Sequence, residues 1–238
     1  YWACISLIDQ QVGRILAVLE AQGELDNTLI VWSSDHGEFL GDYNCFGKRS
    51  FLDAAANVPM LARYPERFPA GVVEKTPVSL IDLVPTFLGA AGADPGSADL
   101  DGRDMASVVG KGEKRTLYGE LQVGRRGNYM AFDGDLKYIY SAGDQKEYLL
   151  DHRVDPLETR NCAANVMYAQ EVKQMRSGLI TYFQKEGYLD PLDGDAWKTY
   201  DKITEPDSPD AGLLIQDAGW AVPHYPIPGY SDDVKIRP

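Results

Sequence analysis

The most constraining feature of this 238-residue sequence is a short apolar run that ends in a polar cluster. Residues 28–32 (Thr-Leu-Ile-Val-Trp) are followed at once by residues 33–38 (Ser-Ser-Asp-His-Gly-Glu). A continuous apolar run of this length is typical of a strand that is buried on both faces. Ligands of open α/β sheets bind beyond the carboxyl ends of the strands. The polar cluster is therefore predicted to lie where chemistry takes place.

A helix is predicted before this strand, and the two together indicate an α/β domain. Between Trp2 and Leu19, apolar side chains recur with the 3.6-residue period of an amphipathic helix, and Gly23 is suited to end it. A helix, a short loop and a buried strand form the repeating unit of a parallel α/β sheet. Residues 57–64 predict a second strand, and residues 78–91 predict a second helix.

The pattern changes near residue 112, where we place a domain boundary. Residues 129–132 and 136–140 flank Asp133-Gly134, which predicts a β-hairpin with a favoured two-residue turn. Residues 147–150 could add a third strand, and residues 163–186 predict a helix that Gly187 ends. We therefore expect an α/β part at 1–112 and a small α+β subdomain at 113–187, with one helix on an antiparallel sheet.

The last segment, 188–238, is irregular, acidic and rich in proline, but it also contains tryptophan and tyrosine. Aromatic side chains of this kind anchor loops on a surface. We expect an arm that wraps the domain or docks on a neighbouring subunit, in which case the protein is a homo-oligomer.

Composition excludes several classes of protein. The formal net charge is −13 and the isoelectric point is near 4.6, which argues against nucleic-acid binding. The three cysteines form no Cys-x-x-Cys pair and are expected to be free thiols. No stretch of 18 consecutive apolar residues occurs, so no membrane span is predicted. The chain starts at Tyr1, inside the first predicted helix, and we expect an N-terminal segment of the protein to be missing.

Three side chains in and after the polar cluster could bind a metal ion and an anion. The carboxylate of Asp35 is a hard oxygen ligand suited to Ca²⁺ or Mg²⁺. His36 could bind the same ion or donate to an oxyanion, and Lys48 could return to the pocket as a positive charge for sulfate or phosphate. From these residues alone, a structural turn at Asp35-His36 is an equal alternative, and a solvated surface lysine is the favoured interpretation of Lys48.

A longer window resembles a known family. Residues 27–48 (Asn-Thr-Leu-Ile-Val-Trp-Ser-Ser-Asp-His-Gly-Glu-Phe-Leu-Gly-Asp-Tyr-Asn-Cys-Phe-Gly-Lys) resemble the sulfatases of the alkaline-phosphatase-like superfamily. The similarity continues through residues 1–19, 58–65, 80–86 and 148–161, and covers the chain to about residue 187. It implies the C-terminal part of an α/β/α sandwich followed by the α+β subdomain.

The resemblance also implies roles for individual residues. Asp35 matches a ligand of the active-site divalent cation, usually Ca²⁺, with Mg²⁺ or Mn²⁺ as alternatives. His36 matches the position beside the metal and the sulfate, and Lys48 matches the lysine that contacts the sulfate and its bridging oxygen. Cationic groups there would neutralise the charge that builds on the leaving oxygen. Arg125 and Arg126 could hold an anionic substrate, although a solvated pair is the alternative.

The sequence departs from the family pattern in several places. Tyr43 stands where many relatives have His, Asp53 where they have Glu, and Asn57 where an Arg is common. The family's Cys/Ser-x-Pro/Ala-x-Arg motif, whose first residue becomes the formylglycine nucleophile, does not occur here, and Cys45 is followed by Phe-Gly-Lys. The nucleophile is therefore expected on the missing N-terminal segment.

The resemblance predicts a sulfuric ester hydrolase that acts on a sulfated small molecule or glycan. One alternative is a phosphonate monoester or phosphodiester hydrolase of the same superfamily. Another is a non-catalytic fragment that serves in assembly or glycan binding. By family resemblance we expect the protein in the periplasm or outside the cell, with the cytoplasm left open.

Overall fold

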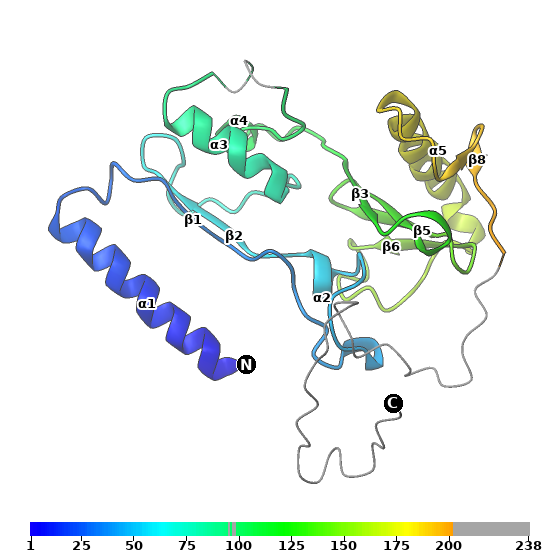
Figure 1. Cartoon of the computed structure of the whole chain (residues 1–238), viewed down its shortest axis with the longest axis horizontal. Coiled ribbons are helices and arrows are strands. Elements are labelled where there is room, and N and C mark those ends of the chain that lie inside the picture. The colour runs from blue at the N-terminus through cyan, green and yellow to red at the C-terminus, as the bar shows by residue number, and fades with distance from the viewer. Residues whose placement is uncertain (95, 97–98, 202–238) are drawn as a thin grey trace, which may run out of the picture. The chain divides into compact units, whose positions relative to one another are not determined.

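The computed structural model describes residues 1–94, 96 and 99–201, and Figure 1 shows the arrangement of their helices and strands. The α-helices are α1 (Trp2–Ala21), α2 (Asp53–Ala56), α3 (Leu83–Ala90), α4 (Met105–Val108) and α5 (Ala169–Lys185). The strands are β1 (Ile30–Ser33), β2 (Met60–Arg63), β3 (Leu117–Leu121), β4 (Asn128–Phe132), β5 (Leu136–Ser141), β6 (Lys146–Asp151), β7 (Leu192–Asp193) and β8 (Ala196–Trp197).

The strands β1 and β2 correct one sequence prediction. They pair antiparallel, with Ile30 opposite Arg63 and Ser33 opposite Met60, so within the described residues β1 has no parallel neighbour. Trp32 is 38% exposed, so β1 is not buried on both faces here. An apolar run indicates burial but not the direction of the neighbouring strand. That direction is decided by the path of residues 34–59, which turn the chain back beside β1.

Helix α1 has the predicted span, but none of its residues is buried in the described structure. Its apolar side chains Ile5, Ile8 and Ile15 are exposed to solvent. By length and composition α1 could cross a membrane, contrary to the sequence expectation, although the core helix of a globular protein meets the same criterion. This observation alone does not assign a membrane span.

The helix predicted at 78–91 is shorter than expected and begins at a buried aspartate. A 3-10 turn, Leu80–Asp82, precedes α3. The carboxylate of Asp82 accepts hydrogen bonds from the backbone N–H groups of Ser79 (2.7 Å) and Arg103 (2.8 Å). It also pairs with both terminal nitrogens of the Arg115 guanidinium, at 2.6 and 2.8 Å. Asp82 thus ties the start of α3 to the chain that leads into β3.

No observation tests a domain boundary near residue 112, which stays a prediction.

The four-stranded sheet confirms the predicted hairpin strands and adds a strand. The turn is centred one residue later than predicted, on Gly134-Asp135, because the Asp133 N–H donates to the Leu136 carbonyl at 3.1 Å. Its order is β3-β4-β5-β6, with every pair antiparallel. Gly134 has a φ of +100°, which glycine adopts without strain, and the Asp133 carboxylate accepts the N–H of Leu136 at 2.8 Å. The predicted third strand is β6. The first strand, β3, was not predicted, because its Gly119 weakens the strand signal. A Cβ at that position would lie 3.0 Å from the Phe51 ring.

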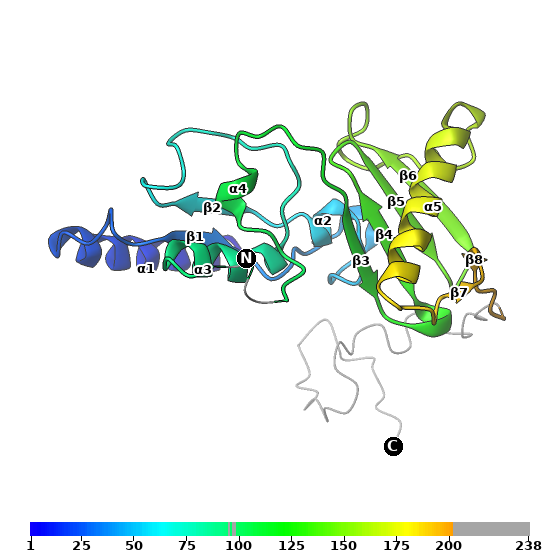
Figure 2. The same cartoon turned by 90° about the horizontal axis from the view of Figure 1, so that it is seen from above.

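The core of this subdomain lies between the sheet and α5, which crosses one face of it (Figure 2). Val172, Leu179 and Phe183 are buried as their spacing predicted, and Gly187 ends the helix with a φ of +72°. The helix starts later than predicted because Asn165 caps a separate 3-10 turn, Val166–Tyr168, by accepting the Met167 N–H at 3.0 Å.

Residues 188–201 add a small hairpin to this core. Strands β7 and β8 pair antiparallel, and the Trp197 ring stacks on Tyr140 with centroids 4.6 Å apart. The Trp197 indole N–H donates to the Tyr138 hydroxyl at 2.9 Å. This part of the predicted arm therefore docks on its own subdomain. The remainder of the arm, and the oligomerisation predicted from it, lie outside the described residues.

Candidate functional site

The candidate site is built on a close contact between the segment after β1 and helix α2. The Gly37 N–H donates to the carbonyl oxygen of Ala55 at 2.8 Å. A Cβ at Gly37 would lie 2.1 Å from the carbonyl oxygen of Ala54, which is far inside van der Waals contact. Only glycine permits this approach. It fixes the neighbouring Asp35 and His36 against α2.

The loop that follows brings Lys48 back toward His36. The Glu38 carboxylate accepts the Gly47 N–H at 2.5 Å and the Leu40 N–H at 3.4 Å, and the Phe39 N–H donates to the Gly47 carbonyl at 3.0 Å. Glu38 thus closes the base of this loop. The closure explains how residues twelve positions apart can meet.

His36 and Lys48 are in direct contact, as their assignment to one site predicted. The His36 Nδ1 lies 2.7 Å from the Gly37 carbonyl oxygen, which requires a proton on Nδ1. The Nε2 lone pair is then free to accept from the Lys48 ammonium, with which it is hydrogen-bonded. Asp35 adjoins them, because its Oδ2 lies 3.4 Å from His36 Nε2.

Asp35 is suited to bind a cation. Its side chain is 83% exposed, and its Oδ1 accepts the His36 N–H at 3.0 Å. Desolvation raises the pKa of Asp35, but this hydrogen bond and the positive charges nearby outweigh it and hold the pKa below its ordinary value. The carboxylate is therefore ionised at neutral pH. It fits a Ca²⁺ site as one oxygen ligand of the six to eight that this ion takes.

The structure does not bring the predicted arginines into this group. Arg125 and Arg126 lie in a 3-10 turn, Gly124–Arg126, between β3 and β4, and both are exposed. Within the described part of the chain, neither guanidinium has a hydrogen bond or an ion pair, and neither contacts Asp35, His36 or Lys48. Their role in substrate binding stays a prediction.

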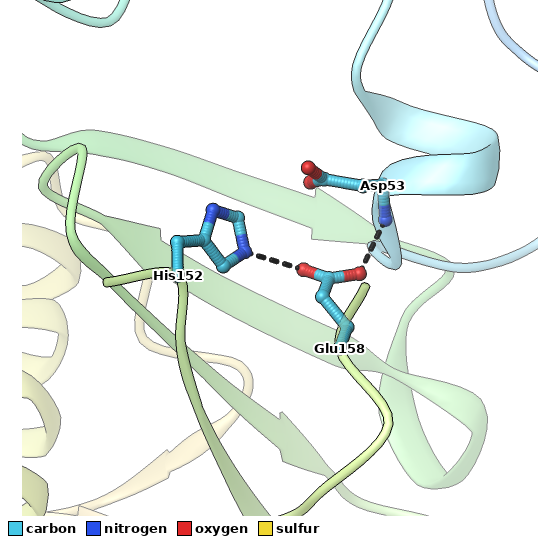
Figure 3. Close-up of side chains that lie close together, drawn as sticks. All are labelled: Asp53, His152 and Glu158. Atoms are coloured by element: carbon cyan, nitrogen blue, oxygen red, sulfur yellow. Dashed lines mark hydrogen bonds and ion pairs between the residues drawn. The ribbon is translucent and has the colours of Figure 1, made fainter. Parts of the chain in front are cut away.

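A second polar cluster, which the sequence did not predict, joins α2 to the C-terminal subdomain. Figure 3 shows His152 and Asp53 on either side of Glu158, and the ligand atoms of these three residues lie within 4.8 Å of one another. Such a group could hold a metal ion. Lys137, however, is 3% exposed, and its ammonium lies 2.6 Å from the Glu158 Oε1 and pairs with Asp53. This ammonium already pairs with both carboxylates, so the cluster is an ion-pair network.

The sequence contained one signal for this network, a lysine inside the apolar strand β5. A lysine is seldom buried unless it is paired. His152 joins the network through its hydrogen bond to Glu158 (2.8 Å), which gives it a structural role. The carboxylate partners lie 84 and 21 residues from Lys137, so spacing alone could not find them.

Comparison with known proteins agrees with the site geometry. Residues 1–93, which carry Asp35, His36 and Lys48, match the family model described as "Sulfatase". This part of the chain belongs to the sulfatase family. The fold is accordingly that of the alkaline-phosphatase-like superfamily, as predicted.

Named sulfatases are among the similar proteins. An N-acetylglucosamine-6-O-sulfatase of Bacteroides thetaiotaomicron is 33% identical over 78% of this chain and 35% of its own length. A choline-sulfatase of Rhizobium meliloti is 33% identical over 69% of this chain and 33% of its own length. The chain thus spans about a third of the length of these curated sulfatases.

Solved structures show the same fold. A protein in complex with its substrate D-glucosamine-2-N,6-O-disulfate has a TM-score of 0.70 and 29% identity, over 80% of this chain and 41% of that one. The phosphonate monoester hydrolase of Silicibacter pomeroyi has a TM-score of 0.65 and 26% identity, over 83% of this chain and 43% of that one. Sulfatases and phosphonate hydrolases therefore share this architecture.

Proposed function

We propose that the protein is a sulfatase that hydrolyses a sulfate ester on a sulfated carbohydrate, and that this chain supplies one side of its active site. The observation that carries the proposal is the convergence of Asp35, His36 and Lys48 within the sulfatase-family segment. The carbohydrate is inferred from the relatives, one named for N-acetylglucosamine-6-O-sulfate and one bound to a glucosamine disulfate.

Each of the three side chains has a distinct role in this proposal. The Lys48 ammonium binds a sulfate oxygen and the bridging oxygen, where negative charge develops as the ester bond breaks. The His36 imidazole holds this ammonium in place through Nε2, while the Gly37 carbonyl fixes the imidazole tautomer. The exposed Asp35 carboxylate is available to a cation.

A divalent cation, Ca²⁺ in our proposal, would be held in part by Asp35. His36 would lie beside the ion without ligating it, because its two ring nitrogens are engaged by the Gly37 carbonyl and by Lys48. When bound, the cation would polarise a sulfate oxygen and offset charge in the transition state. The donor chemistry fits, because Asp35 is ionised and exposed. The remaining ligands and the formylglycine nucleophile would come from the rest of the sulfatase domain.

The experiment is a comparison of site variants in the full-length protein. Lys48→Ala is expected to lower kcat for sulfate release from glucosamine-6-sulfate derivatives by at least a hundredfold, because one cationic donor to the transition state is lost. Asp35→Asn is expected to lower both kcat and the affinity for Ca²⁺, measured by calorimetry. Lys185→Ala is the matched control, since among the described residues the ammonium of this exposed lysine of α5 pairs only with Glu186. Full activity of Lys48→Ala would contradict the site assignment.

The second candidate, phosphonate monoester hydrolysis, is favoured by the similarity to the Silicibacter pomeroyi enzyme. The same cationic side chains suit a phosphonate and a sulfate, since both are tetrahedral anions. Rates on an aryl sulfate and on an aryl phosphonate monoester, measured with one preparation, separate the two. A higher kcat/KM for the phosphonate would reverse our assignment. A protein inactive on both would favour the non-catalytic alternative.

A further inference from the structure

We infer that the C-terminal subdomain positions the Lys48–His36 pair, through Glu158 and Lys137 at one point and through the backbone of Leu157 at another. None of these residues touches His36 or Lys48 in the described structure. They act through α2 and through the loop that carries Lys48. The inference rests on the proposed function in so far as Lys48 and His36 bind the anion.

The first point of attachment is the start of α2. Glu158 Oε2 accepts the Asp53 N–H at 2.5 Å, and this N–H belongs to the first residue of the helix. An N–H at that position has no partner within the helix itself. The Lys137 ammonium donates to the Phe51 carbonyl at 2.9 Å and also pairs with the Asp53 side chain. Two buried side chains of the subdomain therefore hold the backbone three to five residues after Lys48.

The far end of α2 passes this constraint to the site. The Ala55 carbonyl accepts the Gly37 N–H at 2.8 Å, and Gly37 packs directly against Ala54. Gly37 also provides the carbonyl that fixes the His36 tautomer. A shift of α2 would therefore move the imidazole and Lys48 together.

The second point of attachment is the tip of the loop. The Tyr43 hydroxyl donates to the Leu157 carbonyl at 2.5 Å, next to Glu158 in the chain. Tyr43 has a φ of +56°, an unfavourable conformation for a non-glycine residue that persists only where its surroundings hold it. The Phe39 ring packs edge-on against the Tyr43 ring at 5.9 Å. A tyrosine at this position therefore anchors the loop.

The charges of Glu158 and Lys137 are consistent with a firm attachment of α2 to the subdomain. Desolvation raises the pKa of Glu158, but its hydrogen bond to His152 and the charge of Lys137 outweigh it and hold the pKa below its ordinary value. Glu158 is thus ionised at neutral pH beside a buried ammonium. Removing one partner of a buried pair leaves an unpaired charge, so mild variants are needed for a test.

The experiment uses Glu158→Gln and Tyr43→Phe in the full-length protein. Glu147→Gln is the matched control, because among the described residues the Glu147 carboxylate bonds only to Arg176 (2.5 Å) and Tyr138 (2.6 Å), both inside the same subdomain. We expect each test variant to lower kcat about tenfold with little change in KM, because a misplaced Lys48 affects the transition state more than ground-state binding. The control is expected to keep kcat within about twofold of the unchanged protein.

Amide hydrogen exchange provides a readout that does not depend on activity. We expect the amides of residues 37–55 to exchange about tenfold faster in Glu158→Gln, with exchange in β4, β5 and β6 unchanged. Equal kcat losses in Glu158→Gln and Glu147→Gln, or unchanged exchange at 37–55, would overturn the inference. If the unchanged protein hydrolyses neither ester, the proposed function fails, and faster exchange confined to residues 37–55 would still support the positioning role.

Discussion

Gly37 is the residue on which the site geometry depends most directly. The side chains on its two sides have different roles. Asp35 and His36 belong to the candidate site, whereas Glu38 accepts the Gly47 N–H and closes the loop. The glycine between them allows the backbone to lie against α2. A side chain at position 37 would push the backbone that carries Asp35 and His36 away from α2.

We therefore predict that Gly37→Ala destabilises the protein by about 1–3 kcal/mol, the usual cost of overpacking. The cause is the 2.1 Å approach of the new Cβ to the Ala54 carbonyl oxygen. Urea unfolding measures the effect. The control is Gly178→Ala in α5, where a Cβ meets nothing within 4 Å and alanine should stabilise by about 0.5–1 kcal/mol. Equal effects of the two changes would contradict the close contact.

At the scale of elements, helix α5 is attached to the β3–β6 sheet through one of its faces only. Its buried stripe packs on the sheet below, while the opposite face is solvated. The same stripe was visible in the sequence, because a period of 3.6 residues places these side chains together. The stability of the subdomain should therefore depend on individual positions of the stripe.

We predict that Leu179→Ala lowers the free energy of unfolding by about 2–5 kcal/mol, because Leu179 is 0% exposed and truncation leaves a cavity. Leu189→Ala is the matched control, since this leucine is 59% exposed and its loss should change stability by less than about 0.5 kcal/mol. Thermal unfolding followed by circular dichroism compares them. A small effect of Leu179→Ala would show that α5 does not pack on the sheet in solution.

At the scale of the whole molecule, the two parts of the sequence differ in how well they cover their apolar side chains. The β3–β6 sheet has a core closed by α5 and by Trp197. Helix α1, in contrast, leaves its apolar face exposed. Large exposed apolar faces mark surfaces that bind other protein segments or associate.

We predict that this chain, expressed by itself, binds the dye ANS and self-associates. The replacement of Ile8 and Ile15 by lysine should reduce both effects, because the two side chains lie on the exposed face of α1. Fluorescence titration and sedimentation velocity measure them. A monomer that does not bind ANS would show that the face is covered within the chain.

Acid should weaken the C-terminal subdomain. The Arg153 guanidinium bonded to Asp151 holds the pKa of this carboxyl at about 2, below its ordinary value of 3.8. A depressed folded-state pKa means that the stabilisation is present above the unfolded value and is lost as the pH falls toward the folded one. We predict that the free energy of unfolding falls between pH 3.8 and 2, and that Asp151→Asn makes this fall shallower. Urea midpoints across this range measure it, and identical slopes would contradict the prediction.

The sequence by itself determined most of the local elements and predicted the candidate site residues. The hairpin at Asp133-Gly134, the stripe of α5 and the end of that helix at Gly187 follow from turn chemistry and periodicity, which act over a few residues. The grouping of Asp35, His36 and Lys48 came from the family resemblance, and the structure confirmed their proximity.

Only the tertiary structure decided how these elements meet. An apolar run does not encode the direction of its neighbour, so the antiparallel pairing of β1 with β2 was missed. The partners of Lys137 come from two distant segments, and Tyr43 meets a carbonyl 114 residues away. The Lys137 contacts form because a buried charge must find a partner somewhere in the folded chain, and local sequence does not say where.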